Sequence, residues 1–258
     1  MKKTLLLVTL ITLLLLVSSA SSQNAPTISS DQRQAVEKVV HDYLLNNPEI
    51  VRDAMQALQI KEDQQKRTAT EAKLKKLGSE IYSDADSPVV GNAKADVSIV
   101  VFFDYFCGYC KKTLPELQTL IAKDKSVRVI YKELPIMGEQ SLIAAKAALA
   151  ASRQGKFEAF HNEMLASPVV NDEKLKVIAA KLGLDYERLT RDMNDPAVAA
   201  AIQRSASLAA ALNIEGTPAY LIGDEFIPGA IGSDALARIV AAQREKLARS
   251  EKVAVGQR

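Results

Sequence analysis

Two cysteines, Cys107 and Cys110, are the only ones in the 258-residue chain, and they stand three positions apart. Two cysteines placed at random in such a chain would have this spacing on the order of one time in a hundred. In the first turn of a helix, residues i and i+3 share one face, so the two sulfur atoms can come close enough to form a disulfide. The pair therefore favours reversible thiol–disulfide chemistry.

The two cysteines would have different roles if a helix begins at the first one. Unpaired backbone N–H groups and the helix dipole favour a thiolate at a helix N-terminus, so Cys107 is predicted to be the nucleophile. Cys110 lies one turn further in, where its own backbone covers it. We therefore expect Cys110 to be the resolving thiol, which attacks the mixed disulfide that Cys107 forms.

Other uses of the pair explain less. A disulfide that closes a four-residue loop stabilises a protein by only about 2 kcal/mol in the chain-entropy model. A metal centre needs further ligands, and His41 and His161 form no cluster in sequence with the pair, so neither a metal site nor a cofactor is predicted. Two thiolates can still hold Cu(I), which leaves a copper-binding or chaperone-like module without turnover as the alternative function.

The residues around the cysteines predict the elements that position them. The apolar, β-branched run 97–103 directly before the pair is typical of a buried strand. A helical stripe of leucines follows the pair, and the run 127–131 predicts a second strand. A strand–helix–strand unit of this kind implies that its two strands are parallel.

Helices are predicted over the next part of the chain and a hairpin after them. Residues 140–212 are rich in alanine and show only helical patterns. Two short strands, 219–222 and 226–227, are joined through a Gly-Asp pair, which is a strong hairpin-turn signal. Ser233 can then cap a closing helix. This order of elements predicts an α/β fold.

Two helices are predicted before the cysteine domain. Apolar residues recur at helical spacing over 35–44, and Asn47 with Pro48 could start a second helix that runs to Leu77. The second helix carries an apolar stripe with no evident partner in its own chain. Its members are Ile50, Val51, Ala54, Met55 and Leu58. Because such a stripe needs cover, we expect these helices to associate two or three copies of the chain.

The first twenty residues have the pattern of a cleaved secretory signal. Lys2 and Lys3 precede an apolar stretch from Leu5 to Val17, and small residues follow at 18–20, where signal peptidase would cut. The apolar stretch is shorter than a membrane-spanning helix requires. We therefore expect an exported protein, located in the periplasm.

The charge balance gives no indication of a nucleic-acid partner. The chain has 33 Lys and Arg against 31 Asp and Glu, and loss of Lys2 and Lys3 with the signal leaves 31 of each. Charges of both signs are interspersed, so there is no basic stripe that could follow a phosphate backbone.

Residues 85–245 resemble the DsbA-type thioredoxin-fold family. The resemblance rests on the run Phe-Phe-Asp-Tyr-Phe-Cys-Gly-Tyr-Cys-Lys over 102–111, on Gly-Thr-Pro at 216–218, and on the helical stretch between them. The run Tyr-Leu-Leu-Asn-Asn-Pro-Glu at 43–49 resembles the N-terminal extension of the oligomeric ScsC-like and Com-like subgroup. Together with the signal pattern, these resemblances divide the chain into three parts. They are a signal peptide at 1–20, a helical oligomerisation module at 21–78, and a thioredoxin domain at 79–250 with an insertion at about 139–212.

The same resemblance implies further site residues. Pro218 would be the cis-proline that packs against the Cys107–Cys110 disulfide, and the backbone of Thr217 would pair with an extended substrate segment. Gly108 and Tyr109, between the cysteines, are also assigned to substrate binding.

Many relatives carry a buried acid six residues before the first cysteine, but Val101 occupies that position here. Glu133 and Asp104 are the nearest candidates in sequence for a relay of the Cys110 proton. Glu133 is favoured because it follows a buried strand.

The resemblance also implies the partners of the chain. The substrates would be exported proteins that contain cysteines, and a membrane redox partner would reset the cysteine pair. The enzyme would be an oxidase, a reductase or an isomerase. Association into a homo-oligomer favours the last two, because copies can hold a substrate between several catalytic faces.

Overall fold

The computed structural model describes residues 29–256, and the chain divides after Asp63 into two compact units. The predicted signal peptide, residues 1–20, lies outside the described residues. No helix between residues 29 and 256 has both the length and the apolar character that a membrane crossing requires.

The first unit contains α2 (Ser30–Asn46) and the first part of α3 (Glu49–Lys76), the two helices that the periodicity predicted. Ser29 begins α2 with a capping box, in which its side chain and that of Gln32 each accept a backbone N–H of the other residue. The prediction that Asn47 caps the second helix is wrong. Asn47 ends α2 instead, and its side-chain amide donates to a carbonyl of the last turn at 2.8 Å.

The apolar side chains of this unit are exposed. No residue of α2 is buried, and large apolar side chains of both helices are at least one-third accessible. They are Val36, Val39, Val40, Tyr43 and Leu45 in α2, and Ile50, Val51, Met55, Leu58 and Ile60 in α3. The stripe predicted from the sequence therefore lies uncovered within its own unit.

The second unit is built on a five-stranded mixed sheet in the order β1-β3-β2-β4-β5. The strands are β1 (Val89–Gly91), β2 (Val97–Phe103), β3 (Val127–Glu133), β4 (Ala219–Ile222) and β5 (Glu225–Pro228). β2 and β3 are parallel, as predicted, and the other neighbours are antiparallel. The sequence did not predict β1, because three residues are too few to show a period.

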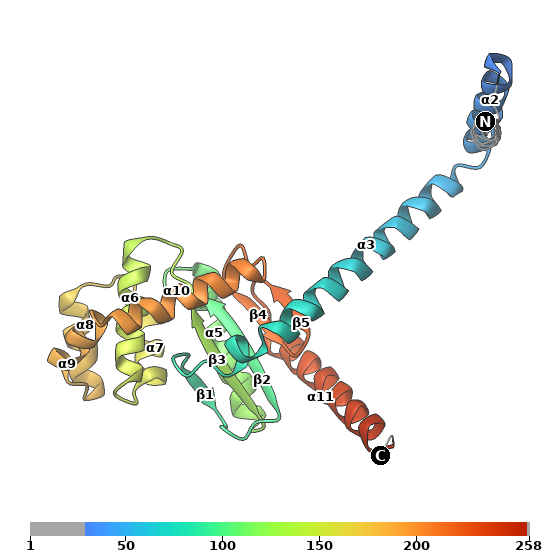
Figure 1. Ribbon diagram of the computed structural model, residues 1–258. Helices are drawn as coiled ribbons and strands as arrows, with labels where there is room; N and C mark the ends of the chain where they lie inside the picture. The colour runs from blue at the N-terminus through green and yellow to red at the C-terminus, as the bar shows by residue number, and fades with distance from the viewer. Residues whose placement is uncertain (1–28, 257–258) are drawn as a thin grey trace, which may run out of the picture. The chain divides into compact units, whose positions relative to one another are not determined.

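Helices cover both faces of this sheet. They are α4 (Gly78–Tyr82), α5 (Gly108–Lys123), α6 (Glu139–Ser152), α7 (Phe157–Leu165), α8 (Asp172–Leu182), α9 (Tyr186–Met193), α10 (Pro196–Ala211) and α11 (Ser233–Gly256). α6 to α10 form the predicted insertion between β3 and β4 (Figure 1). α4 was not predicted, since Gly78 was expected to end a helix and instead begins one.

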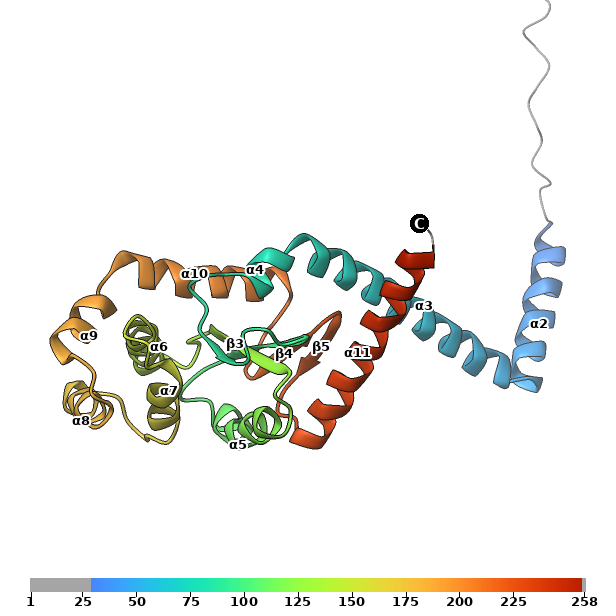
Figure 2. The same cartoon turned by 90° about the horizontal axis from the view of Figure 1, so that it is seen from below.

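The two faces of the sheet belong to different parts of the core. Val101 of β2 packs with α5, α7 and α11, whereas Val100 packs with α4 and α10. Figure 2 shows α4 and α10 on one side of the strands and α5 on the other. Leu74, in the last turns of α3, is also buried in the α4 and α10 core. β2 is thus enclosed on both faces, and it leads directly to the cysteines at the start of α5.

Candidate active site

The two cysteines lie together at the N-terminus of α5. Cys107 is the N-cap residue and Cys110 is in the first turn, as the spacing predicted. Both thiols are free, and the residues are only 3% and 2% exposed. The backbone N–H of Cys110 donates to Cys107 Sγ at 3.4 Å. The helix terminus therefore offers a donor to the first sulfur and encloses the second.

The loop before β4 completes the site from a distant part of the chain. The Cys107 thiol donates to the carbonyl oxygen of Thr217 at 3.2 Å, and the Thr217–Pro218 peptide bond is cis, as the resemblance implied. Pro218 is buried beneath this contact and Thr217 is half-buried. The topology brings this loop to α5 because β4 pairs with β2.

Cys110 is in surroundings that disfavour its charged form. Burial raises the pKa of its thiol well above the ordinary value, because a thiolate there would lose its hydration. The neighbouring Cys107 raises this pKa further, whereas hydrogen bonds from Asp104 and Thr217 oppose the shift. Chemistry that needs a Cys110 thiolate must therefore stabilise that charge inside the protein.

A groove of about 470 Å³ opens beside Cys107. Its lining residues are Cys107, Gly108, Tyr109, Lys112, Ile136, Met137, Gly216 and Thr217. Tyr109 is 64% exposed, and the Lys112 ammonium lies 5.4 Å from the centre of its ring. The structure thus brings Gly108, Tyr109 and Thr217 together around one apolar groove, with an exposed Ile-Met pair that the sequence did not indicate.

Asp104 holds the loops around this groove. Its buried carboxylate accepts the N–H groups of Phe106, Ile136 and Met137 at 2.7, 2.8 and 3.0 Å, and the Ser141 hydroxyl at 2.8 Å. Four donors to one carboxylate occupy the oxygens that a proton relay would use. The geometry of Asp104 is therefore that of a structural anchor.

Glu133 lies in a buried polar cluster with Tyr105 and His161. The Tyr105 hydroxyl donates to Glu133 Oε1 at 3.4 Å and lies 3.1 Å from His161 Nδ1. Burial raises the pKa of Glu133 well above its ordinary value and lowers the pKa of His161 to about 3, so it disfavours the charged form of both side chains. The cluster shares the core of the cysteines, but the hydrogen bond of Glu133 is made to Tyr105.

The sequence did not indicate this cluster. His161 is 2% exposed, and its ring stacks on Phe157 and meets Phe103 and Tyr131 edge-on. Tyr105 precedes Glu133 by 28 residues and His161 by 56 residues in the chain. A histidine next to two phenylalanines was the only signal available.

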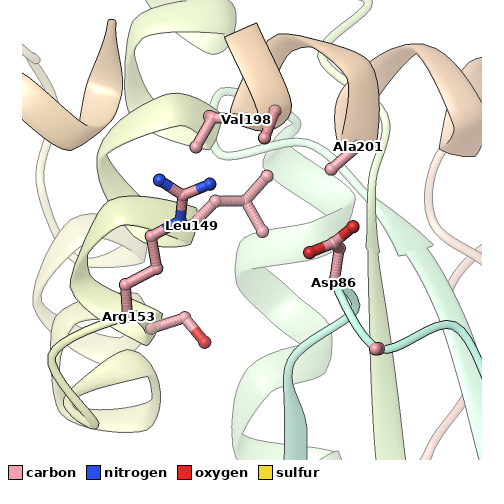
Figure 3. A pocket seen from close by; sticks show the side chains of 8 residues that line it. Asp86, Leu149, Arg153, Val198 and Ala201 are labelled. Carbon is pink, nitrogen blue, oxygen red and sulfur yellow. The ribbon is translucent and has the colours of Figure 1, made fainter. Parts of the chain in front are cut away.

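Another hollow of the second unit lies between α6, α10 and the segment before β1 (Figure 3). Its charged side chains are already paired. Arg153 bonds Asp195 at 2.6 Å, and Asp86 is ion-paired with Arg204. Across the described part of the chain, no three His, Cys, Asp or Glu side chains gather in a metal-binding arrangement. We therefore assign the chemistry to the cysteine site.

Two family models match the chain. Residues 98–241 match the DSBA-like thioredoxin domain, and residues 32–65 match the copper resistance protein ScsC N-terminal domain. The first match includes both cysteines and the Thr-Pro pair. The second covers most of α2 and the beginning of α3.

Similar proteins agree with both matches. A thioredoxin-like oxidoreductase from Silicibacter pomeroyi is 42% identical, over 65% of this chain and 97% of its own, with a TM-score of 0.62. A linker-deletion mutant of Proteus mirabilis ScsC is 29% identical, over 87% of this chain and 100% of its own, with a TM-score of 0.64. The thiol:disulfide interchange protein DsbA of Bordetella parapertussis is 26% identical, over 61% of this chain and 78% of its own. The chain spans only 24 to 25% of the length of other curated relatives, which are Na⁺/H⁺ antiporters.

Proposed function

Because this chain belongs to the DsbA-like family of thioredoxin-fold thiol–disulfide oxidoreductases, we propose that it exchanges disulfides with cysteine-containing proteins through Cys107 and Cys110. The setting of Cys107 carries the proposal. Its sulfur accepts the N–H of Cys110, neighbours the carbonyl of Thr217, and borders an apolar groove. A sulfur at a helix N-terminus and beside a groove suits attack on an incoming substrate.

The exchange has two steps. The Cys107 thiolate attacks one sulfur of a substrate disulfide, the substrate S–S bond breaks, and the other substrate sulfur leaves as a thiolate that takes up a proton. Cys110 then loses its proton and attacks Cys107 Sγ. The Cys107–Cys110 disulfide forms and the substrate leaves as a thiol. The cysteine pair has lost two electrons, and the substrate has gained them. The reverse sequence oxidises a substrate dithiol.

The groove gives the substrate a binding mode. When Cys107 is a thiolate it no longer donates to Thr217, so that carbonyl becomes free to accept an N–H from an extended substrate segment. Tyr109, Ile136 and Met137 are exposed around the groove and would contact apolar side chains beside the substrate cysteine. Gly108 adds no side chain that would block the approach. Pro218 would support the Thr217 backbone from below.

The exposed helices support an assembly of two or three copies. Residues 21–78 would form the oligomerisation module, with the exposed stripes of α2 and α3 packed on the same stripes of another copy. Burying each large apolar side chain would contribute roughly 1.5 to 3 kcal/mol. Such an assembly would favour isomerase or reductase activity, since it holds several thioredoxin domains, each within residues 79–250, around one substrate.

The compartment follows from the same family. A cleaved signal at residues 1–20 would export the chain to the periplasm, where its substrates would be exported proteins with cysteines. A membrane redox partner would return the pair to its working state after each cycle. Its role depends on direction, because an isomerase must be kept reduced and an oxidase must be kept oxidised.

Turnover assays test the proposal. The purified chain without residues 1–20 should reduce insulin and recover activity from scrambled ribonuclease, and Cys107→Ser should abolish both activities. Oxidation of a reduced peptide, measured beside them, gives the direction. If the chain binds Cu(I) tightly and shows no turnover in any of the three assays, the proposal is wrong and the copper-binding alternative takes its place.

A further inference from the structure

Tyr220 has a buried hydroxyl group with no hydrogen-bond partner. The residue lies in β4, two positions after the cis-proline, and is 0% exposed. Among residues 29–256 its hydroxyl is one of two fully buried side-chain polar atoms without a partner, the other being Glu133 Oε2. Folded proteins rarely leave such a group unpaired, because its lost hydration is not replaced. The hydroxyl therefore calls for an explanation.

The position of Tyr220 in the sheet places it on the same face as the cysteines. Tyr220 is paired with Val101 across the sheet and belongs to the same core face as Cys107 and Cys110. Burial raises the pKa of the phenol to about 12, and negative charge on either cysteine raises it further. The Thr113 side chain acts in the opposite direction and lowers this pKa, but in the structure its own proton is donated to the carbonyl of Cys110 at 2.8 Å.

A phenol with these properties remains protonated throughout the working pH range and is therefore a donor. The hydrogen of a hydroxyl can turn about the C–O bond, so it can point to a charge that appears beside it. Cys110 is the group on which charge must appear, and the residue is only 2% exposed. The donor thus lies on the face of the sheet where this charge must appear.

We propose that the Tyr220 hydroxyl stabilises the Cys110 thiolate during disulfide exchange, an inference that rests on the proposed function. When the mixed disulfide is resolved, Cys110 loses its proton to solvent, and the departing substrate thiolate takes up a proton from solvent. Cys110 Sγ bonds to Cys107 Sγ as the bond from Cys107 to the substrate breaks. Tyr220 keeps its own proton and lowers the energy of the attacking thiolate. In the reverse direction it stabilises Cys110 as the leaving group.

The two acids nearest in sequence are already engaged. Asp104 accepts four hydrogen bonds from the loops, and Glu133 accepts from Tyr105. The Tyr220 hydroxyl differs from both carboxyl groups because it makes no hydrogen bond in the structure.

A reporter disulfide separates the two steps. The reduced protein is mixed with 5,5′-dithiobis(2-nitrobenzoate), which releases one coloured thiolate when Cys107 attacks and a second when Cys110 resolves the adduct. In Tyr220→Phe the ratio of the second rate to the first should fall about tenfold or more, the loss expected when a charged group loses one hydrogen bond. The unfolding temperature should stay the same or rise, because the variant removes an unpaired buried hydroxyl.

Tyr131→Phe is the matched control. Tyr131 is also buried on this face of the sheet, in β3 on the other side of Val101, and its loss should leave the ratio unchanged. An unchanged ratio in a folded Tyr220→Phe protein would overturn the inference while wild-type insulin reduction still upholds the proposed function. If the wild type releases no second thiolate and does not reduce insulin, it is the proposed function that fails.

Discussion

The two sulfur atoms of this protein differ in what surrounds them. Cys107 accepts a backbone N–H and borders the groove, whereas Cys110 is enclosed by its helix, by Thr113 and by the face of β4 that carries Tyr220. Burial raises the pKa of the Cys110 thiol, so it does not compete for a substrate in the first step. The asymmetry supports one attacking and one resolving thiol.

Trapping tests this division. In Cys110→Ser the mixed disulfide through Cys107 cannot be resolved internally, so substrates from an exported-protein extract should accumulate as covalent adducts. These adducts are seen as reducible bands on a non-reducing gel. Cys107→Ser is the matched control and should trap little. Equal trapping by the two variants would show that the roles are assigned wrongly.

Asp104 gives a second prediction, on stability. Asp104→Ala removes an acceptor shared by four donors, so it should lower the free energy of unfolding by about 2 to 4 kcal/mol. It should also slow the turnover of insulin, because the loop at 136–137 that lines the groove is no longer held. Urea denaturation measures the first effect. Asp86→Ala is the control, because Asp86 is exposed and its ion pair should contribute only about 0 to 1 kcal/mol. Similar losses in both variants would contradict the role of Asp104 as an anchor.

Glu133 gives a prediction about pH. Because burial raises its pKa in the folded state above 4.5, the folded protein binds more protons at this site than the unfolded chain as pH rises from 4.5. The stability that Glu133 contributes in acid is therefore lost with rising pH. Glu133→Gln stays neutral and still accepts from Tyr105, so its gain in unfolding free energy over the wild type should grow above pH 4.5.

Urea titrations at several pH values measure that difference. The exposed Glu158→Gln is the matched control and should show no such trend. A constant difference between Glu133→Gln and the wild type across the range would mean that the carboxyl group is charged in the folded protein.

Local signals predicted one part of the site and not the other. Cys107, Cys110 and the strand before them are contiguous, so spacing and apolar pattern were enough. Tyr220 faces the pair only because β4 docks on β2 from more than 110 residues away, and no local pattern carries that pairing. The anchoring role of Asp104 depends likewise on loops that arrive from residues 136–141.

At the scale of elements, one arginine of α11 makes ion pairs with two segments next to the sheet. Arg244 bonds Asp96 before β2 at 2.7 and 2.8 Å, and Asp124 after α5 at 2.7 and 3.1 Å. The guanidinium lowers the pKa of both carboxyl groups, and its planar fork can serve both together. This clamp therefore joins the middle of α11 to the start of β2 and to the end of α5, the cysteine helix.

Arg244→Ala should lower the free energy of unfolding by about 1 kcal/mol, since the site is partly exposed, and less at high salt. Thermal unfolding at low and high salt measures both effects. Lys246→Ala on the same helix removes a single exposed pair with Asp224 and should have a smaller effect. A loss that is equal in the two variants would argue against the clamp.

Most elements were predictable from the periodicity of apolar residues and from turn and capping residues. The strand at 97–103, the parallel pair, the insertion and the hairpin were all predicted, because each has a run long enough to show its period or a specific turn signal. β1 and α4 are too short for that. The closing helix runs to Gly256, although its later turns are mostly polar.

At the scale of the whole molecule, the division after Asp63 suggests where to separate the units. Residues 64–258 keep Leu74 in the core of the second unit, whereas a start at residue 79 would remove it. This fragment should be a monomer that reduces insulin as well as the chain without residues 1–20 does. It should lose most activity on scrambled ribonuclease, because a single site cannot hold an unfolded substrate between several others.

Sedimentation and the two assays decide this. Met55→Lys in the longer chain is a matched variant, since it alters only the exposed stripe and should reproduce the effect of the deletion. A monomeric longer chain would exclude the proposed assembly. A monomeric fragment with full ribonuclease activity would separate assembly from function.

The outer strands of the sheet have a consequence for a protein proposed to work among unfolded chains. β1 has three residues and β5 has four, and β5 ends at Pro228, which has no N–H to offer. An unfolded polypeptide therefore finds few free backbone groups at these edges with which it could pair as an added strand. We expect that such a protein does not promote aggregation of its substrates by strand pairing. Substrates would instead be held by a covalent disulfide bond that is readily reversed.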